Sequence, residues 1–225
     1  MYRVEDKYCC SRTEMYVLQN RIGSVLHPDI NENSAEGYSI ISLYFDDLCD
    51  SCYQDTLDGH EIRDKYRIRI YNNSLDKIRL EVKQKRDSRI RKYAKDIDLD
   101  QMRRLMNGQC IEDDLLSASN PVTLFNMAIR TRGLRPKVIV AYERKAYVFD
   151  AGNVRITFDR NLRACERTEL FGREDVVYDS LREQDSVLEV KYDEFIPDFL
   201  LQLLELGNMQ QSAYSKYQMC REMYE

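Results

Sequence analysis

Several common carriers of function are scarce or missing in these 225 residues. The chain has only two histidines, His27 and His60, so at most two imidazole ligands are available to a metal site. No apolar stretch approaches the ~20 residues that a membrane-spanning helix needs. The opening, MYRVEDKY, has no apolar run, and we therefore expect no secretory signal peptide. The sequence also shows no low-complexity tract and no internal repeat.

The seven cysteines follow no framework spacing, and their number is odd. Cys49 and Cys52 form a lone C-x-x-C pair. A structural zinc site would need a second such pair or nearby histidines, so we expect no metal at the thiols. A reduced, cytoplasmic setting is the simplest interpretation of this cysteine usage.

Positive charge is concentrated in one segment of an acidic chain. Residues 63–95 hold 13 Lys and Arg against 4 acidic residues, whereas the whole chain has a net charge of −5. Within this segment, residues 66–70 and 79–85 alternate charged and apolar side chains, which predicts strands. The Asn72-Asn73-Ser74 sequence between them indicates a turn. We therefore expect a hairpin with one apolar and one basic face, and a local anion site rather than a nucleic-acid-binding surface.

The rest of the chain predicts an α+β fold. Further strands are expected at residues 2–9, 38–46, 88–97, 137–149, 153–160, 162–170 and 187–192. Helices are expected from a capping box at Ser11 to near Pro28, at 99–106, 121–133, 197–206 and 212–224, with a short helix or irregular segment at 48–59. Few βαβ units occur, so we expect a closed antiparallel β barrel within a single domain, 1–225, with flanking helices and a helical insertion around 98–133.

Nearly every predicted long strand places at least one cation on one of its faces. These cations are Lys7, Arg67, Arg69, Lys83, Lys92, Arg144, Arg155 and Lys191, and two strands also carry a glutamate, Glu81 or Glu189, two residues before a lysine. If these faces point outward, they form an ordinary polar exterior. If they point inward, two like charges ~5 Å apart repel by ~3 kcal/mol at an effective dielectric of 20. Removing Arg67 is then expected to stabilise the unliganded protein. The strand pattern alone leaves both orientations open.

An inward orientation would require a polyanion. Phosphates suit such a lining, because Arg binds them with two parallel hydrogen bonds and Lys acts as a point charge. Glu81 and Glu189 would then supply oxygen ligands for Mg²⁺ or Mn²⁺, which bridges phosphates with few protein ligands.

Taken in order, short motifs along nearly the whole chain resemble the VTC domain, the polyphosphate polymerase branch of the CYTH-like triphosphate tunnel metalloenzymes. The motifs are Lys7-Tyr8, Ser42-Leu43-Tyr44-Phe45-Asp46, Arg67-Ile68-Arg69-Ile70-Tyr71, Glu81-Val82-Lys83, Glu143-Arg144, Val154-Arg155-Ile156 with Asp159, Leu188-Glu189-Val190-Lys191 and Ser215-Lys216. A further lysine of the family aligns best with Lys92. The Glu5-Asp6-Lys7 start lacks the first glutamate of the ExExK pattern of CYTH enzymes, which favours the VTC branch.

The resemblance implies a closed tunnel barrel with the basic residues inside and the C-terminal helix at one mouth. It implies transfer of the terminal phosphoryl group of ATP to a growing polyphosphate chain, with Mn²⁺ or Mg²⁺ as cofactor. Glu189, with Glu81, would bind the metal. The implied phosphate-binding residues are Lys7, Arg67, Arg69, Lys83, Lys92, Arg144, Arg155, Lys191 and Lys216. Of these, Arg67, Arg69, Lys83, Arg144 and Arg155 would act in catalysis together with Glu189.

Two other functions are compatible with the same residues. A triphosphatase or polyphosphatase would use water as the acceptor, and a non-enzymatic module would bind polyphosphate or single-stranded RNA. Glu81 and Glu189 argue against a pure anion binder, which has no use for carboxylates among its cations. We expect ATP and polyphosphate as partners and no nucleic acid. Export of the product would require a separate membrane protein, which would place the chain at the inner face of a membrane.

Overall fold

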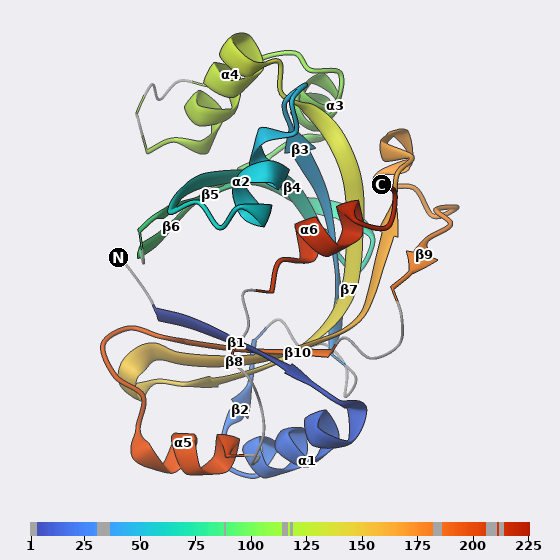
Figure 1. Ribbon diagram of the computed structural model, residues 1–225. Coiled ribbons are helices and arrows are strands. Elements are labelled where there is room, and N and C mark those ends of the chain that lie inside the picture. Colours follow the sequence, from blue (N-terminus) through green and yellow to red (C-terminus); the bar gives the residue numbers. More distant parts are fainter. Residues whose placement is uncertain are drawn as a thin grey trace. The chain divides into compact units, whose positions relative to one another are not determined.

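The computed structural model describes residues 4–30, 37–87, 89–113, 117, 119–181, 186–205, 211 and 214–225. The strands are β1 (Val4–Cys10), β2 (His27–Pro28), β3 (Tyr38–Asp46), β4 (Ile62–Tyr71), β5 (Ser74–Arg86), β6 (Arg89–Ile97), β7 (Arg135–Phe149), β8 (Val154–Cys165), β9 (Asp179–Ser180) and β10 (Ser186–Tyr192). The helices are α1 (Arg12–Gly23), α2 (Ser51–Leu57), α3 (Leu99–Met106), α4 (Pro121–Arg132), α5 (Asp198–Leu204) and α6 (Lys216–Arg221) (Figure 1).

The strands belong to one sheet in the order β1-β10-β8-β7-β3-β4-β5-β6, with β2 paired to β7 and β9 to β8. The ladders whose register is described are antiparallel. This confirms the expected α+β class and the antiparallel sheet. No pairing of β1 with β6 occurs among the described residues, so closure of the sheet into a barrel stays a prediction. None of the helices in the described ranges is long and apolar enough to cross a membrane.

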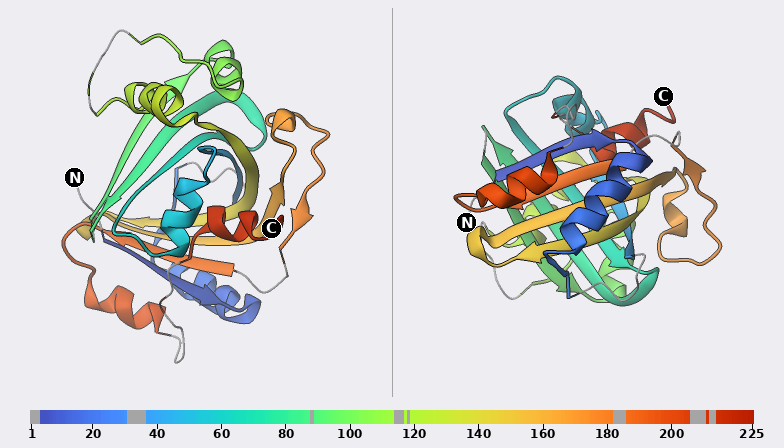
Figure 2. Two further views of the ribbon diagram at one scale, coloured as in Figure 1. Left: turned by 45° about the horizontal axis from the view of Figure 1, so that its top comes forward. Right: turned by 90° about the horizontal axis from the view of Figure 1, so that it is seen from below.

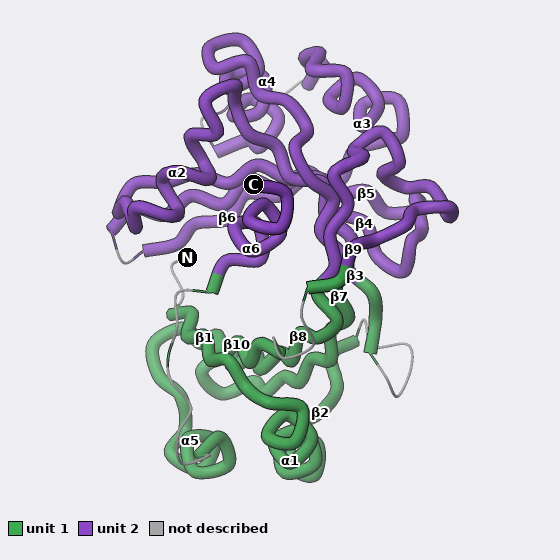
Figure 3. Tube along the Cα trace, turned by 45° about the vertical axis from the view of Figure 1, so that its right-hand side comes forward, with its two compact units in different colours: residues 1–39, 142–162, 180–214 green, residues 40–141, 163–179, 215–225 purple. Residues whose placement is uncertain are grey.

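The chain divides into two compact units (Figure 3). Unit 1 comprises Met1–Ser39, Tyr142–Leu162 and Ser180–Tyr214. Unit 2 comprises Ile40–Ala141, Arg163–Asp179 and Ser215–Glu225. Strands β3, β7, β8 and β9 contribute residues to both. Each unit has its own sheet surface, with an apolar face covered by helices and a charged face.

In unit 1, helices α1 and α5 cover the apolar face of β1, β10 and β8 (Figure 2). Alternate residues of β10 and β8, such as Leu188 and Ile156, pack in one core with Leu18 of α1 and Leu200 of α5. Helix α1 begins with the expected capping box, in which the Ser11 hydroxyl accepts from the backbone of Glu14 and the Glu14 carboxylate accepts in return. Because strand side chains alternate between faces, burying these apolar residues places their charged neighbours on the opposite face.

In unit 2, strands β3 to β6 follow the same rule. The ring of Phe125 in α4 makes edge-to-face contacts with Phe45 of β3 and Tyr66 of β4. Figures 1 and 2 show α3 and α4 on one side of these strands and α2 and α6 on the other. The β4–β5 hairpin turns at Asn72 and Asn73, whose φ angles are 51° and 53°. Asparagine tolerates this left-handed conformation, and the predicted hairpin is confirmed.

Four predicted elements, two strands and two helices, are wrong in their extent. The strands expected at 153–160 and 162–170 form a single strand, β8, because Asn161 adopts a left-handed φ of 54° and the pairing continues past it; a short 3₁₀ turn, Thr168–Leu170, follows. Helix α1 ends at Gly23, and His27–Pro28 pairs with β7 as β2. Helix α6 is shorter than predicted and begins after the N-cap Ser215; residues 212 and 213 lie outside the described residues.

Candidate functional site

The charged face of unit 2 holds a compact group of side chains that we call the Glu81 cluster: Tyr44, Arg67, Arg69, Glu81 and Lys92. The register of β4 and β5 places Arg67 opposite Glu81, and Tyr44 of β3 lies opposite Arg67 on the other side. Strand β6 brings Lys92 opposite Lys83. The cluster therefore contains residues from four neighbouring strands, and all of its members lie on the charged face of the sheet.

Glu81 is the centre of this cluster, and its side chain is only 1% exposed. Arg67 contacts Oε2 through Nε at 2.7 Å and Nη2 at 2.6 Å. Lys92 Nζ lies 2.6 Å from Oε1, and Arg69 Nη1 lies 3.8 Å from Oε2. Arg67 also donates through Nη1 to the Tyr44 hydroxyl at 2.9 Å, and Arg69 donates to the Ser42 hydroxyl at 3.2 Å. Three cations thus surround one carboxylate.

The charges in this cluster shift one another's pKa values. Burial alone would raise the pKa of Glu81, but Arg69, Arg67 and Lys92 lower it well below its ordinary range. Burial lowers the pKa of Lys92 to about 7, and Arg67 and Arg69 act in the same direction, while Glu81 partly opposes them. The Lys92 side chain keeps 44% of its surface exposed, which weakens the contribution of burial to this shift.

Further cations extend the basic face beyond the cluster. Lys65 of β4 lies opposite Lys83 of β5, which in turn lies opposite Lys92. Lys65 Nζ donates to the hydroxyl of Ser215 at 2.7 Å. Ser215 is the N-cap of α6, and Lys216 is the first residue of that helix. The start of α6 is therefore tied to the basic face of unit 2.

The charged face of unit 1 holds a second group, the Glu189 cluster, with members Glu5, Lys7, Arg144, Asp159, Glu189 and Lys191. The β1–β10 register places Lys7 opposite Glu189 and Glu5 opposite Lys191. Lys7 Nζ lies 3.2 Å from Glu5 and 3.8 Å from Glu189. Lys191 Nζ lies 3.5 Å from Glu5 and 3.1 Å from Glu189. Two buried carboxylates thus share the same two ammonium groups.

Arg144 joins this cluster through a pair of short contacts. Its Nε and Nη2 donate to the two oxygens of Asp159 at 2.6 and 2.7 Å, and Nη2 lies 3.5 Å from Glu189. Burial would lower the pKa of Arg144, but Asp159, Tyr142 and Glu189 raise it well above its ordinary value. Arg155, on the neighbouring strand, pairs with Asp29 at 2.7 Å and donates to the Tyr38 hydroxyl at 3.1 Å. Carboxylates therefore face the principal cations of unit 1.

A sequence model of the VTC domain matches residues 2–224. The chain belongs to the VTC domain family. No curated protein matches it. A protein of Pyrococcus horikoshii OT3 resembles it in structure, with a TM-score of 0.53 and 15% identity over 99% of both chains. A putative adenylyl cyclase of Hippeastrum, described as having a dominant triphosphatase activity, has a TM-score of 0.58 and 14% identity over 99% of this chain and 96% of that one.

A third similar structure, a putative adenylate cyclase of Vibrio parahaemolyticus, has a TM-score of 0.50 and 14% identity over 90% of this chain and 82% of that one. At these identities the structural matches establish a shared fold. They agree with the resemblance to CYTH-like proteins that the strand motifs indicate.

The predicted site residues of this VTC domain fall into two sets. Unit 2 brings together Arg67, Arg69, Glu81, Lys83 and Lys92. Unit 1 brings together Lys7, Arg144, Glu189 and Lys191, with Arg155 opposite Lys191. Within the described ranges, no group of three or more His, Cys, Asp or Glu side chains is placed to hold a metal ion. The roles of these residues in substrate and metal binding stay predictions.

Sequence reasoning assigned no site role to four members of this arrangement: Glu5, Tyr44, Lys65 and Asp159. A signal existed for each. Glu5 and Lys65 lie two residues before Lys7 and Arg67, and Asp159 lies four residues after Arg155, so all three share a face with predicted site residues. Tyr44 belongs to a family-like motif. For Glu5, Tyr44 and Asp159 the reason is that the sequence pattern identifies cations, whereas the structure pairs those cations with carboxylates and a phenol. Lys65 lies on the basic face predicted from the alternation but is not part of a family motif.

Proposed function

We propose that this VTC domain is a metal-dependent polyphosphate polymerase, which transfers the terminal phosphoryl group of ATP to a growing polyphosphate chain. One observation carries the proposal: each unit sets a buried glutamate among Arg and Lys side chains on the charged face of its sheet. Cations with carboxylates are the components that enzymes use to hold phosphates together with a divalent ion. The closed tunnel implied by the resemblance is part of this proposal.

The Glu81 cluster is proposed to bind phosphates. Arg67, Arg69 and Lys92 outnumber the single carboxylate that they surround, and Lys65 and Lys83 add positive charge on the same face. A surplus of this kind attracts anions, and guanidinium groups bind phosphate oxygens with two parallel hydrogen bonds. Successive residues on one face of a strand are ~6–7 Å apart, so Arg67 and Arg69 suit neighbouring phosphates of one chain.

The Glu189 cluster is proposed to hold the divalent ion. Glu5 and Glu189 supply buried carboxylate oxygens, which are the ligands that a hard cation prefers. Both carboxylates already contact the same two positive groups, the ammonium groups of Lys7 and Lys191. The contacts of Glu189 with Lys7, Lys191 and Arg144 are all longer than 3.0 Å. Glu81 fits less well, since Arg67 and Lys92 hold its two oxygens at 2.6 Å. Mg²⁺ and Mn²⁺ bind through one or two carboxylates plus phosphate oxygens.

The proposed reaction needs positioning and charge neutralisation more than covalent catalysis. A terminal oxygen of polyphosphate forms a bond to the γ-phosphorus of ATP, the bond from that phosphorus to the bridging oxygen breaks, and ADP leaves with the bonding electrons. The attacking oxygen is already anionic, so no general base is required. Arg and Lys side chains would hold the reacting phosphates, and a bound divalent ion would neutralise charge on the phosphate oxygens.

A triphosphatase is the second candidate, because the structurally similar Hippeastrum protein is described as having that activity. The same cations would hold the triphosphate, and water would replace the chain end as acceptor. The polymerase is preferred because the family matched over residues 2–224 is the VTC domain.

Incubation of the purified protein with ATP and Mn²⁺ tests the proposal. Long-chain polyphosphate and ADP are the expected products. Free phosphate without polyphosphate would show that the protein is a hydrolase. If ATP is not consumed at all, the protein is a non-enzymatic binding module. Glu189→Gln should abolish turnover while retaining tripolyphosphate binding. Glu143→Gln is the matched control, because Glu143 lies next to Arg144 but pairs with Arg160 in a partly exposed contact at 3.0 Å.

We also propose a cytoplasmic setting. All seven cysteines are free thiols, which is compatible with a reducing compartment. In such a setting a separate membrane protein would be required for polyphosphate to leave the cell interior.

A further inference from the structure

We infer that Tyr44 and Tyr217 are positioning residues, through which helix α6 sets the orientation of the Arg67 guanidinium. The inference rests on the proposed function, in which Arg67 binds phosphate. Tyr44 belongs to the Glu81 cluster as a partner of Arg67, and the proposed reaction gives neither tyrosine a contact with phosphate. Both lie in unit 2, and the contacts that link them to Arg67 form a continuous series.

The series begins at the phenol of Tyr44. Its hydroxyl accepts a hydrogen bond from Nη1 of Arg67 at 2.9 Å, and the guanidinium carbon lies 5.7 Å from the centre of the Tyr44 ring. Glu81 holds the other side of the same guanidinium through Nε and Nη2. Two partners on two different strands therefore define the plane of the Arg67 side chain.

Tyr217 of α6 holds the Tyr44 ring in turn. The two rings are stacked, with centroids 5.0 Å apart and planes inclined by 21°. Tyr217 is 1% exposed, and its hydroxyl donates to Asp46 at 2.6 Å. The ring of Tyr217 is thus fixed at its edge by a hydrogen bond and at its face by stacking, and it restricts the rotation of Tyr44.

Further contacts fix α6 itself. Arg221 donates to Asp50 at 2.8 Å, and its guanidinium carbon lies 5.2 Å from the centre of the Tyr53 ring. Ser215, at the start of the helix, accepts from Lys65 at 2.7 Å. Because both ends of α6 are held by other elements of unit 2, Tyr217 is a rigid support. Bidentate recognition of phosphate depends on the plane of the guanidinium as well as on its charge, and this support provides that plane.

Tyr44→Phe is the decisive variant, since it keeps the ring and its stacking and removes only the hydroxyl. Isothermal titration with tripolyphosphate should show about three- to tenfold weaker binding, the range to which one net hydrogen bond corresponds. In NMR spectra, the side-chain Nε–H signal of Arg67 should show faster rotation of the guanidinium. Tyr217→Leu, which removes the stack, should reproduce both effects; if this variant does not fold, Tyr44→Phe alone decides.

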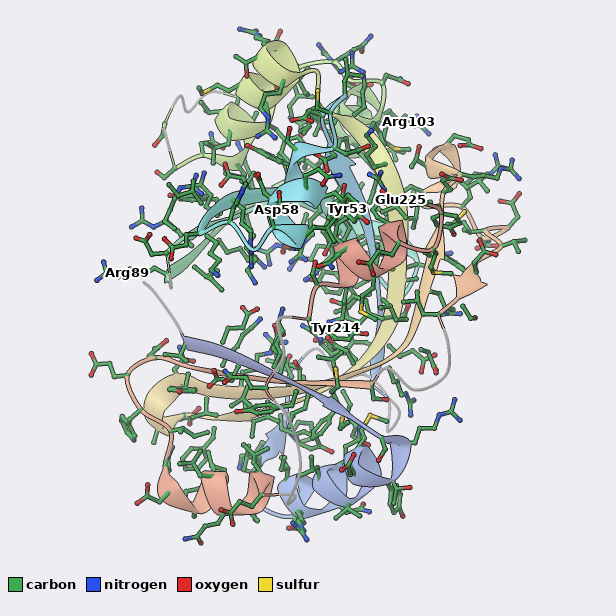
Figure 4. All side chains as sticks on the ribbon, viewed as in Figure 1. Tyr53, Asp58, Arg89, Arg103, Tyr214 and Glu225 are labelled. Atoms are coloured by element: carbon green, nitrogen blue, oxygen red, sulfur yellow. The ribbon has the colours of Figure 1, made fainter. Side chains whose placement is uncertain are left out.

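Tyr93→Phe is the matched control. Tyr93 lies opposite Val82 on the face away from Glu81, and its hydroxyl accepts from Arg91 at 3.2 Å in an exposed contact. Tyr53 is unsuitable, because its hydroxyl donates at 2.7 Å to Glu225 beside it (Figure 4) and so also holds the end of α6. Tyr93→Phe loses a phenolic hydrogen bond of unit 2 and should keep wild-type affinity and a wild-type Arg67 signal. Equal affinities and equal Arg67 signals in Tyr44→Phe and Tyr93→Phe would overturn the inference.

Arg67→Ala separates this inference from the proposed function. If wild type binds tripolyphosphate and Arg67→Ala does not, the phosphate role stands, and Tyr44→Phe then tests positioning. If wild type and Arg67→Ala bind equally, or neither binds, Arg67 does not bind phosphate and its positioning for phosphate is overturned with that role. The Arg67 signal would then report only whether Tyr44 orients the side chain.

Discussion

At the scale of single residues, the positive charges are matched rather than left in mutual repulsion. Sequence alone suggests that removing Arg67 relieves repulsion and stabilises the empty protein. The structure reverses that expectation, because Arg67 makes the two shortest contacts to Oε2 of a buried glutamate, Glu81. Removing a partner from a buried carboxylate lowers the free energy of unfolding, because the charge is left less well compensated.

Arg67→Ala is therefore expected to lower the free energy of unfolding by about 1–3 kcal/mol, since Glu81 retains Arg69 and Lys92. Urea denaturation without ligand measures the change. Arg160→Ala is the control, because its partner Glu143 is 32% exposed and the loss should stay below about 1 kcal/mol. A more stable Arg67→Ala protein would show that repulsion among the cations outweighs the contact with Glu81.

Lys92 provides a prediction about protons. Its pKa in the free protein is lowered to about 7, so at pH ~8 a large share of the side chain is neutral. Bound phosphates bring negative charge close and raise this pKa. Binding of tripolyphosphate at pH ~8 should therefore take up protons, which calorimetry in buffers of different ionisation enthalpy measures. Lys92→Arg stays charged and should abolish the uptake; an unchanged uptake in this variant would assign the proton to another group.

Gly37 and Gly59 both have positive φ angles, 93° and 70°, but different surroundings. A Cβ at Gly37 would collide with the backbone carbonyl of Arg144, whereas one at Gly59 would meet nothing within 4 Å. Gly59→Ala should cost about 1–2 kcal/mol for backbone strain alone. Gly37→Ala should cost about 1–3 kcal/mol more for the overlap. Equal losses in urea denaturation would mean that the carbonyl of Arg144 moves aside freely.

At the scale of elements, Asp46 connects strand β3 to two helices. Its carboxylate accepts from the backbone N–H groups of Cys52 and Tyr53 in α2 and from the hydroxyl of Tyr217 in α6. Asp46 is fully buried, with 0% exposure. One side chain at the end of β3 therefore fixes the helices that pack on the charged face of unit 2.

Asp46→Asn should destabilise the protein by about 2–4 kcal/mol, because an amide nitrogen cannot accept a hydrogen bond and leaves a buried donor unpaired. Asp55→Asn in α2 is the control. Its partner, His60, is 56% exposed, and the loss should stay below about 1 kcal/mol. Chemical denaturation of the two variants makes the comparison, and similar losses would remove Asp46 from this connecting role.

At the scale of the whole molecule, the chain is acidic, with a net charge of −5, yet it carries a basic segment at residues 63–95. Anion binding should therefore be local and should depend on the number of charges on the ligand. A single phosphate satisfies one guanidinium, whereas a chain of phosphates reaches several cations of unit 2 at once. This difference predicts a selective gain in stability with polyphosphates.

Tripolyphosphate at about 100 times its Kd should add about 2.7 kcal/mol to the free energy of unfolding. For a chain of this size, that raises Tm by about 5–10 °C. Thermal denaturation with sodium sulfate at matched ionic strength is the control and should give a much smaller shift. The same shift with both salts would indicate a general salt effect and contradict a specific phosphate site.

The sequence by itself determined the features that depend on neighbours along the chain. Alternation at 66–70 and 79–85 predicted β4 and β5, the asparagines at 72 and 73 predicted the turn, and Pro121 with Gly133 predicted the limits of α4. Parity also predicted which residues share a face, because side chains alternate strictly along a strand. The same reasoning failed at Asn161, where a left-handed residue lets β8 continue.

Only the tertiary structure decided which carboxylate meets which cation. Arg67 meets Glu81, and Arg144 meets Asp159, because strand register sets one residue opposite another, and register depends on contacts between distant segments. The stacking of Tyr44 on Tyr217 joins positions that are far apart in the sequence, and no local pattern encodes it. Periodicity specifies the face of the strand on which a side chain lies, whereas the pairing of strands and helices specifies which side chain it meets. That partner sets the charge, the pKa and the orientation of the side chain.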